Sequence, residues 1–292
     1  MTTPSHTNHT RTTVRRHSHS HTKTFFMART LANFFVAASL TTGLLGGLWC
    51  LTPAEAKPAA APRIVLSTII SLQDLHDEAA TQLALVKQYL DTKKSYADSA
   101  KHELPQAAGV LAVIGQAIAQ HDSKPTARES ADQPPISGHL LRDTALKLAA
   151  SKTQAGALAL VPTLQAIING RSSKTKATPR PWKGLISLHH VMEELNARNS
   201  RLRRAIRRPG DPKLDSRNAA TMSLLGLVVL ADTHEVKDKA ELPKWNQYSV
   251  DFQTNAAATA RALRSGDKKL IKPLYLKAAK ACADCHSKFR SE

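Results

Sequence analysis

Residues Cys282-Ala283-Asp284-Cys285-His286 place two cysteines and a histidine in the order Cys-x-x-Cys-His near the C-terminus. On a helix, the cysteines and the histidine stand at i, i+3 and i+4 and project from one face. This spacing is typical of a c-type haem attachment site. Two thiols can then add to the two vinyl groups of one porphyrin, while the adjacent histidine reaches the iron as proximal ligand. The motif therefore predicts one covalently attached haem c.

Two other kinds of site also use a Cys-x-x-Cys pair. A thioredoxin-like redox pair would follow a strand and open a helix, whereas this pair closes a long helical run. A zinc site would need two further ligands, for which His189 and His190 are the obvious donors. Adjacent helical residues point about 100° apart, which suits one tetrahedral site poorly. Haem attachment is therefore the preferred interpretation.

Residues 27–56 have the three parts of a secretory signal. Residues 27–29 are a short basic start, residues 31–51 are apolar, and residues 54–56 (Ala-Glu-Ala) fit a cleavage site. We therefore expect an exported, periplasmic protein with no stable membrane insertion after cleavage. The alternative is an uncleaved anchor, because the apolar run is long enough to span a bilayer.

Residues 1–26 are rich in Thr, Ser and His and include the tract His17-Ser18-His19-Ser20-His21. Such a tract is a candidate metal-binding segment. The preferred interpretation is that translation begins at Met27, or that residues 1–26 extend the signal. Residues 1–56 are accordingly treated as an N-terminal extension and signal peptide, outside the fold.

The cysteines and the charges restrict the class of protein further. Of the three cysteines, Cys50 would leave with the signal and the other two would carry haem, so no disulfide is expected. The formal net charge of +18 favours acidic partners, and we expect acidic redox proteins. Nucleic acid is another common partner of basic chains. An exported protein rarely meets it, and stacking aromatic residues make up only 4% of the chain.

After residue 56 the sequence predicts an all-α fold, since it is rich in Ala, Leu and Lys and lacks sustained period-2 alternation. Proline, glycine and polar runs divide it into eight expected helices. These helices cover about 63–90, 96–120, 138–150, 155–168, 182–207, 215–234, 245–264 and 268–290. The polar stretch 171–181 is predicted to be a linker between a helical bundle, 57–170, and a second one, 182–292.

The two predicted bundles match when one is shifted by 116 residues along the other. The matching segments are Ile70-Ser71-Leu72 with Ile186-Ser187-Leu188, Asp77-Glu78 with Glu193-Glu194, and Leu90 with Ile206. We therefore predict a duplication. The first half contains no cysteine, so it is predicted to be a haemless bundle.

Residues 182–292 resemble the cytochrome c prime family, the class II c-type cytochromes. Members are four-helix bundles whose haem motif lies near the C-terminus of the last helix. The family's ending, two cysteines and a histidine followed by an aromatic residue and an arginine, is matched by Cys282, Cys285, His286, Phe289 and Arg290. The resemblance implies a four-helix bundle that carries haem at its C-terminus, with Phe289 and Arg290 beside the haem.

The chain departs from this family in two respects. It has an extra N-terminal half, and Leu188-His189 stand where the family has an Arg-Gln pair on the distal side of the haem. Family members are often dimers through their first helices. We expect the haemless half to occupy that surface as an internal partner, with a homodimer as the alternative.

Two functions compete for such a haem protein. The first is an electron carrier with His286 and a sixth iron ligand; the alternative is a five-coordinate haem protein that binds NO or CO. An enzyme is not expected, because di-haem peroxidases need two haem motifs and the chain has one. Four further histidines are scattered along the chain and are expected at surface or capping positions. They are His102, His121, His139 and His234.

Met192 is the predicted sixth iron ligand. It lies on the apolar seam of the expected helix 182–207, together with Leu188 and Leu195. The methionine-ligated branch of the family places its thioether at this point, and a thioether opposite histidine raises the reduction potential. The alternatives are that Met192 only fills core space, or that His189, three residues earlier, is the ligand.

Overall fold

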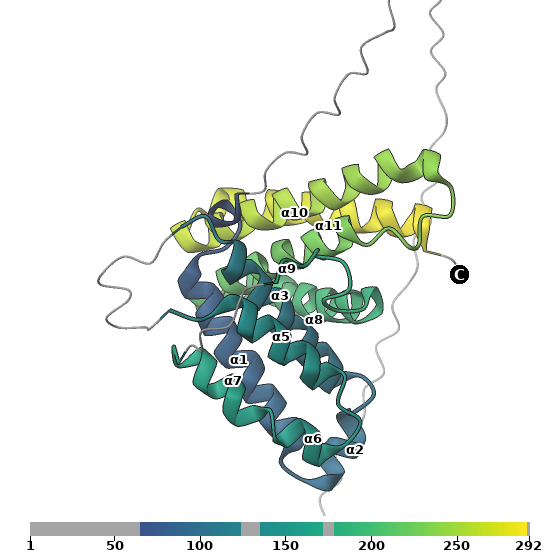
Figure 1. Cartoon of the computed structure of the whole chain (residues 1–292). Coiled ribbons are helices and arrows are strands. Elements are labelled where there is room, and N and C mark those ends of the chain that lie inside the picture. Colours follow the sequence, from purple (N-terminus) through teal and green to yellow (C-terminus); the bar gives the residue numbers. More distant parts are fainter. Residues whose placement is uncertain (1–64, 124–134, 172–177, 291–292) are drawn as a thin grey trace, which may run out of the picture. The chain divides into compact units, whose positions relative to one another are not determined.

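The computed structural model describes residues 65–123, 135–171 and 178–290 (Figure 1). Regular structure in these ranges is entirely helical and includes no strand, which confirms the all-α class. Several predictions fall outside the described residues: the signal sequence, Met27, Cys50 and the His17–His21 tract. Residues 172–177 of the predicted linker also lie outside them.

In the first half, four helices pack against one another in chain order, and the first of them also contacts the last. They are α1 (Leu72–Leu90), α3 (Glu103–Gln120), α5 (Gly138–Ala149) and α7 (Val161–Ile168). Two short helices, α2 (Lys93–Ser99) and α6 (Gln154–Leu158), precede α3 and α7.

The second half repeats this order of packing. Its helices are α8 (Leu188–Arg207), α9 (Pro212–Ala231), α10 (Leu242–Ser265) and α11 (Lys268–Phe289). Each contacts the next along the chain, and α3 also contacts α8 and α9 (Figure 1). All the described residues belong to one compact unit. The separation into domains 57–170 and 182–292 stays a prediction.

Serine caps explain why two helices begin later than predicted. The Ser71 hydroxyl accepts a hydrogen bond from the backbone N–H of Asp74, so α1 begins at residue 72 rather than 63, after the short 3₁₀ helix η1 (Leu66–Thr68). Ser187 caps α8 in the same way, by accepting a hydrogen bond from the backbone N–H of His190. Before it, Gly184 has a φ of 81°, a left-handed conformation that does not continue a helix. A polar side chain at the N-cap satisfies a backbone donor that the helix leaves unpaired.

Two predicted helices are each divided in the structure. The expected helix 96–120 is split into α2 and α3, and the expected helix 155–168 into α6 and α7. Pro162 lies in the first turn of α7, where its missing N–H costs no hydrogen bond. The remaining helices agree with the prediction to within about three residues at each end, the usual uncertainty of helix limits.

The core is built around α3 and α9, which are buried on nearly every side. Residues 107–117 of α3 and 218–229 of α9 are all buried, because small and apolar residues dominate both runs. Glycine allows α3 and α5 to approach closely: a Cβ atom on Gly115 would lie 2.4 Å from the backbone nitrogen of Arg142. These helices therefore form a tightly packed centre against which the others lie.

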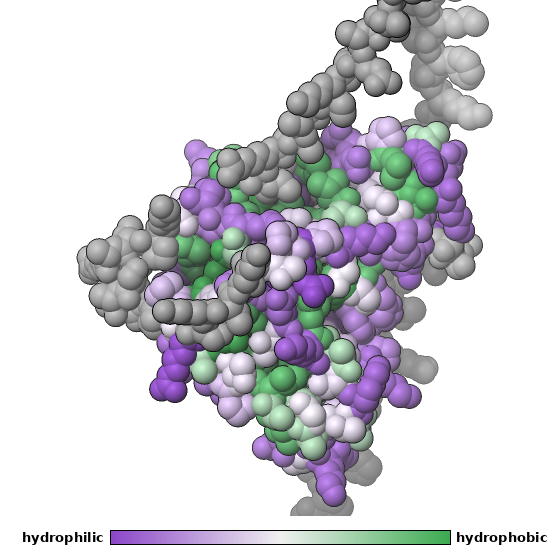
Figure 2. All heavy atoms as spheres, in the orientation of Figure 1, coloured by the Kyte–Doolittle hydropathy of each residue, from purple (hydrophilic) through white to green (hydrophobic). Residues whose placement is uncertain are grey.

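The surface is mainly hydrophilic on the face drawn in Figure 2, with patches of hydrophobic residues between the hydrophilic ones. None of the described helices combines the length and apolar character needed to cross a bilayer.

Candidate functional site

Helix α11 presents the Cys-x-x-Cys-His motif to a cavity of about 300 Å³. Its N-terminus is capped by the Asp267 carboxylate, which accepts hydrogen bonds from the N–H groups of Lys269 and Leu270. Cys282, Cys285 and His286 all line this cavity, and both thiols are free and partly buried. The spacing i, i+3, i+4 thus brings the three reactive side chains together on one helical face.

The other walls of the cavity come from α8, α9 and α10. The lining residues from these helices are Met192, Leu195, Asn196, Asn199, Met222, Val229, Tyr248, Ser249 and Phe252. All four helices of the second half therefore contribute to the cavity. Its volume lies at the lower end of the range typical of small-molecule and cofactor sites, about 300–1,000 Å³.

Burial sets the protonation of the motif. It raises the pKa of the Cys282 thiol to about 12, and the neighbouring Cys285 adds to this effect. Burial also raises the pKa of Cys285. The pKa of His286 is lowered, first by burial and then by the charge of Arg290. At neutral pH the thiols are therefore protonated and the imidazole is neutral, the form in which histidine binds a metal ion.

One buried polar atom in the cavity wall has no partner. Ser249 is only 3% exposed, and its hydroxyl forms no hydrogen bond with any described residue. Asn199, in contrast, has a partner: its Oδ1 accepts a hydrogen bond of 2.7 Å from the Tyr275 hydroxyl. A buried hydroxyl without a partner is costly unless a bound group or water pairs with it. Two thiols and an imidazole on one helical face are the groups that would hold a covalently attached haem, and the Ser249 hydroxyl would need a polar partner on a bound group or a water.

Phe289 and Arg290 lie beside this cavity and are not among its lining residues. Phe289 packs edge-to-face on Trp245, with ring centroids 5.2 Å apart, and on Tyr248 at 6.4 Å. The Trp245 indole donates a hydrogen bond of 2.9 Å to the carbonyl of Val229. Phe289 therefore holds the end of α11 against α10, next to the cavity wall. The contact of either residue with haem stays a prediction.

The structure places two methionines at the cavity. Met192 of α8 lines it, as does Met222 of α9, which is 3% exposed. Sequence reasoning missed Met222 because α9 is buried almost all round, so hydrophobic periodicity marks no face of that helix. His189, the rival ligand, is not among the lining residues: its side chain is 67% exposed and pairs with Glu193.

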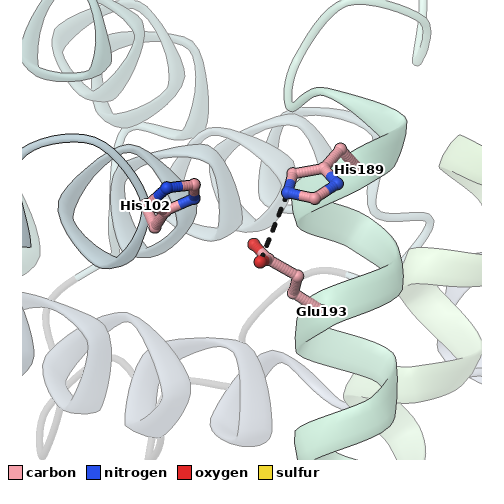
Figure 3. Close-up of side chains that lie close together, drawn as sticks. All are labelled: His102, His189 and Glu193. Atoms are coloured by element: carbon pink, nitrogen blue, oxygen red, sulfur yellow. Dashed lines mark ion pairs between the residues drawn. The ribbon is translucent and has the colours of Figure 1, made fainter.

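Among the scattered histidines, three make hydrogen-bond contacts, and one of them is His139, whose Nδ1 lies 3.4 Å from the Ser137 hydroxyl. His121 Nε2 lies 3.0 Å from the carbonyl of Ile70, and His234 Nδ1 lies 2.9 Å from the carboxylate of Asp232. His102 occupies the N-cap position of α3, but its side chain forms no capping hydrogen bond. Instead its ring lies near that of His189 (Figure 3).

Comparison with known protein families, with curated proteins and with solved structures gave no match to this chain. The function of the site must therefore be inferred from its own residues.

Proposed function

We propose that this protein is an exported c-type cytochrome that carries electrons between redox partners, with one haem c bound by Cys282, Cys285 and His286. The observation that carries the proposal is that both thiols and this imidazole line one cavity, together with Met192. In the proposed arrangement α8 to α11 form the haem-carrying four-helix bundle. The haem supplies a one-electron ferrous–ferric couple when it is bound.

Each lining side chain has a definite role in this proposal. The two cysteines hold the cofactor through thioether bonds, and the neutral His286 is the proximal ligand. Leu195, Val229 and Phe252 form apolar walls that exclude water, which favours a stable iron coordination. Met192 is the proposed sixth ligand.

The surroundings of the motif support an acidic redox partner. Four exposed basic residues lie near the motif in the sequence: Lys277, Lys280 and Lys288 in α11, and Arg290 at its C-cap. Lys280 pairs with Asp284 and Lys288 with Glu241. Basic side chains around an exposed edge of a redox site steer acidic proteins toward it and increase the rate of encounter. This steering would weaken as the ionic strength rises.

Attachment is tested with the variant Cys282→Ala/Cys285→Ala. We expect it to lose haem staining on a denaturing gel, because no thioether can then hold the cofactor. The variant Cys50→Ala is the matched control and should retain full staining. Full staining of the double variant would refute the c-type assignment.

The optical spectrum of the wild type separates the two candidate functions. A six-coordinate low-spin ferric spectrum is expected for the electron carrier. A five-coordinate high-spin spectrum, with CO binding in the ferrous state, would instead favour the gas-binding alternative.

A further inference from the structure

A second cluster of metal-binding side chains lies away from the proposed haem site, where the start of α3 meets the first turns of α8. His102, His189 and Glu193 each bring one ligand atom to within 4.8 Å of the other two (Figure 3). None of the three lines the haem cavity. Separate parts of the sequence therefore converge here on two imidazoles and a carboxylate.

The spacing within α8 already suits a shared metal ion. His189 Nε2 lies 3.3 Å from Glu193 Oε1, since the two residues are one helical turn apart. Zinc binds histidine nitrogen and carboxylate oxygen at about 2.0–2.2 Å, so neighbouring ligand atoms of a tetrahedral site lie about 3.3–3.5 Å apart. The separation of this pair therefore matches that of two ligands of one tetrahedral zinc ion.

His102 is free to complete the site. Its side chain is exposed and forms no hydrogen bond to the first turn of α3, although it occupies the N-cap position. Its ring centroid lies 6.2 Å from that of His189 and 6.3 Å from that of His190. A small rotation of an exposed side chain would bring its nitrogen to coordination distance.

His190 contacts the second oxygen of the Glu193 carboxylate. Its Nδ1 lies 3.0 Å from Glu193 Oε2, the oxygen that does not face His189, and its side chain is only 15% exposed. The hydrogen bond from His190 is the main reason that the pKa of Glu193 lies below its usual value. Ligands of biological metal sites are commonly oriented by such hydrogen bonds to their second atom.

We propose that His102, His189 and Glu193 bind a divalent transition-metal ion, with Zn²⁺ as the best match to the donor set. Imidazole nitrogen suits zinc, copper and nickel, and two histidines with one carboxylate form a known zinc set that leaves a fourth position for water. The ion would join the N-terminal end of α3 to α8 and so link the two halves of the chain. This proposal does not depend on the haem.

The test measures Zn²⁺ binding to the haem-containing protein by isothermal titration calorimetry. Every sample carries Ala at His17, His19 and His21, so that this tract contributes no metal ligand in any molecule that retains residues 1–56. We expect one saturable equivalent of Zn²⁺, bound at least about tenfold more weakly by His102→Ala and by Glu193→Gln, since even losing an outer-shell partner costs about 10–100-fold.

The matched control is His76→Ala, which removes a histidine of α1 that is outside the cluster. It should bind Zn²⁺ like the parent. Zn²⁺ should also raise the unfolding temperature of the parent and of His76→Ala, and that of His102→Ala by clearly less, because weaker binding stabilises the folded state less. Binding by His102→Ala equal to that of the control, or no saturable equivalent in the parent, would overturn the proposal.

Discussion

Replacing Arg198 with alanine should lower the free energy of unfolding substantially. The guanidinium is 3% exposed, and it donates hydrogen bonds of 2.5 Å to Glu78 on α1 and 2.6 Å to Glu194 on its own helix. Removing one member of a buried ion pair typically costs about 3–5 kcal/mol, because the remaining charge stays buried without compensation.

The remaining contacts place the expected loss at the lower end of this range, about 3 kcal/mol. Glu78 would keep a hydrogen bond from Gln82 and a longer ion pair with Arg217, whose Nε lies 3.4 Å away. Glu194 would keep the hydrogen bond of 2.5 Å from Gln106. Both carboxylates would therefore be only partly compensated.

Urea unfolding of the full chain, followed by far-UV circular dichroism, measures this change. Arg203→Ala is the matched control: it removes an exposed arginine of the same helix and should change stability by no more than about 0.5 kcal/mol. The double variant Glu78→Gln/Arg198→Met should recover part of the loss, since it removes a buried charge as well as its partner. Equal stability of Arg198→Ala and Arg203→Ala would refute the argument.

Three further predictions concern the proposed haem cavity at Cys282, the packing of the core and the stability of the protein in acid. Met192→Ala should convert a low-spin ferric spectrum to a high-spin one, whereas Met222→Ala should leave it low-spin; the opposite pattern would assign the sixth ligand to Met222. Gly115→Ala should cost at least about 1–3 kcal/mol in urea unfolding, because its new methyl group would collide with the backbone of Arg142. Burial alone would raise the pKa of Glu78, but its arginine partners hold the value below the ordinary 4.5. Its contribution to stability should thus be complete above pH 4.5 and lost as the pH falls below that value. Unfolding curves recorded from pH 6 to pH 3 should show a smaller acid loss in Glu78→Gln than in the wild type, since Asp77 and Asp143, whose pKa values are also lowered, still contribute.

Local sequence rules predicted much of the helical structure. Residues 268–290 were expected to be helical, and Lys268–Phe289 form α11, which brings Cys282, Cys285 and His286 to one cavity. The rules were less accurate at helix starts, since Ser71 and Ser187 cap helices that hydrophobic periodicity alone would extend toward the N-terminus.

Contacts between segments distant in the sequence were not predictable in this way. His102 appeared to be an isolated surface histidine, because its neighbours His189 and Glu193 lie more than eighty positions later in the chain. Met222 was missed for a different reason: a helix buried on all sides carries no periodic pattern that marks one face. Neither feature could be recognised until the helices had been packed together.

The buried ion pairs of Arg198 join two glutamates that the predicted duplication places at equivalent positions. Helices α1 and α8 begin 116 residues apart, the same shift that aligned the two halves, and this shift also relates Glu78 to Glu194. Two buried carboxylates at equivalent positions would repel each other if both halves were identical. The halves differ one turn later, where Gln82 of the first corresponds to Arg198 of the second, and this one arginine binds both glutamates. Arg198 of the second half therefore neutralises the buried glutamate of the first half as well as its own. We expect the proposed haemless half to act as an internal partner of the proposed haem half. Sedimentation of the protein as a monomer would agree with this, and a homodimer held by the haem halves alone would contradict it.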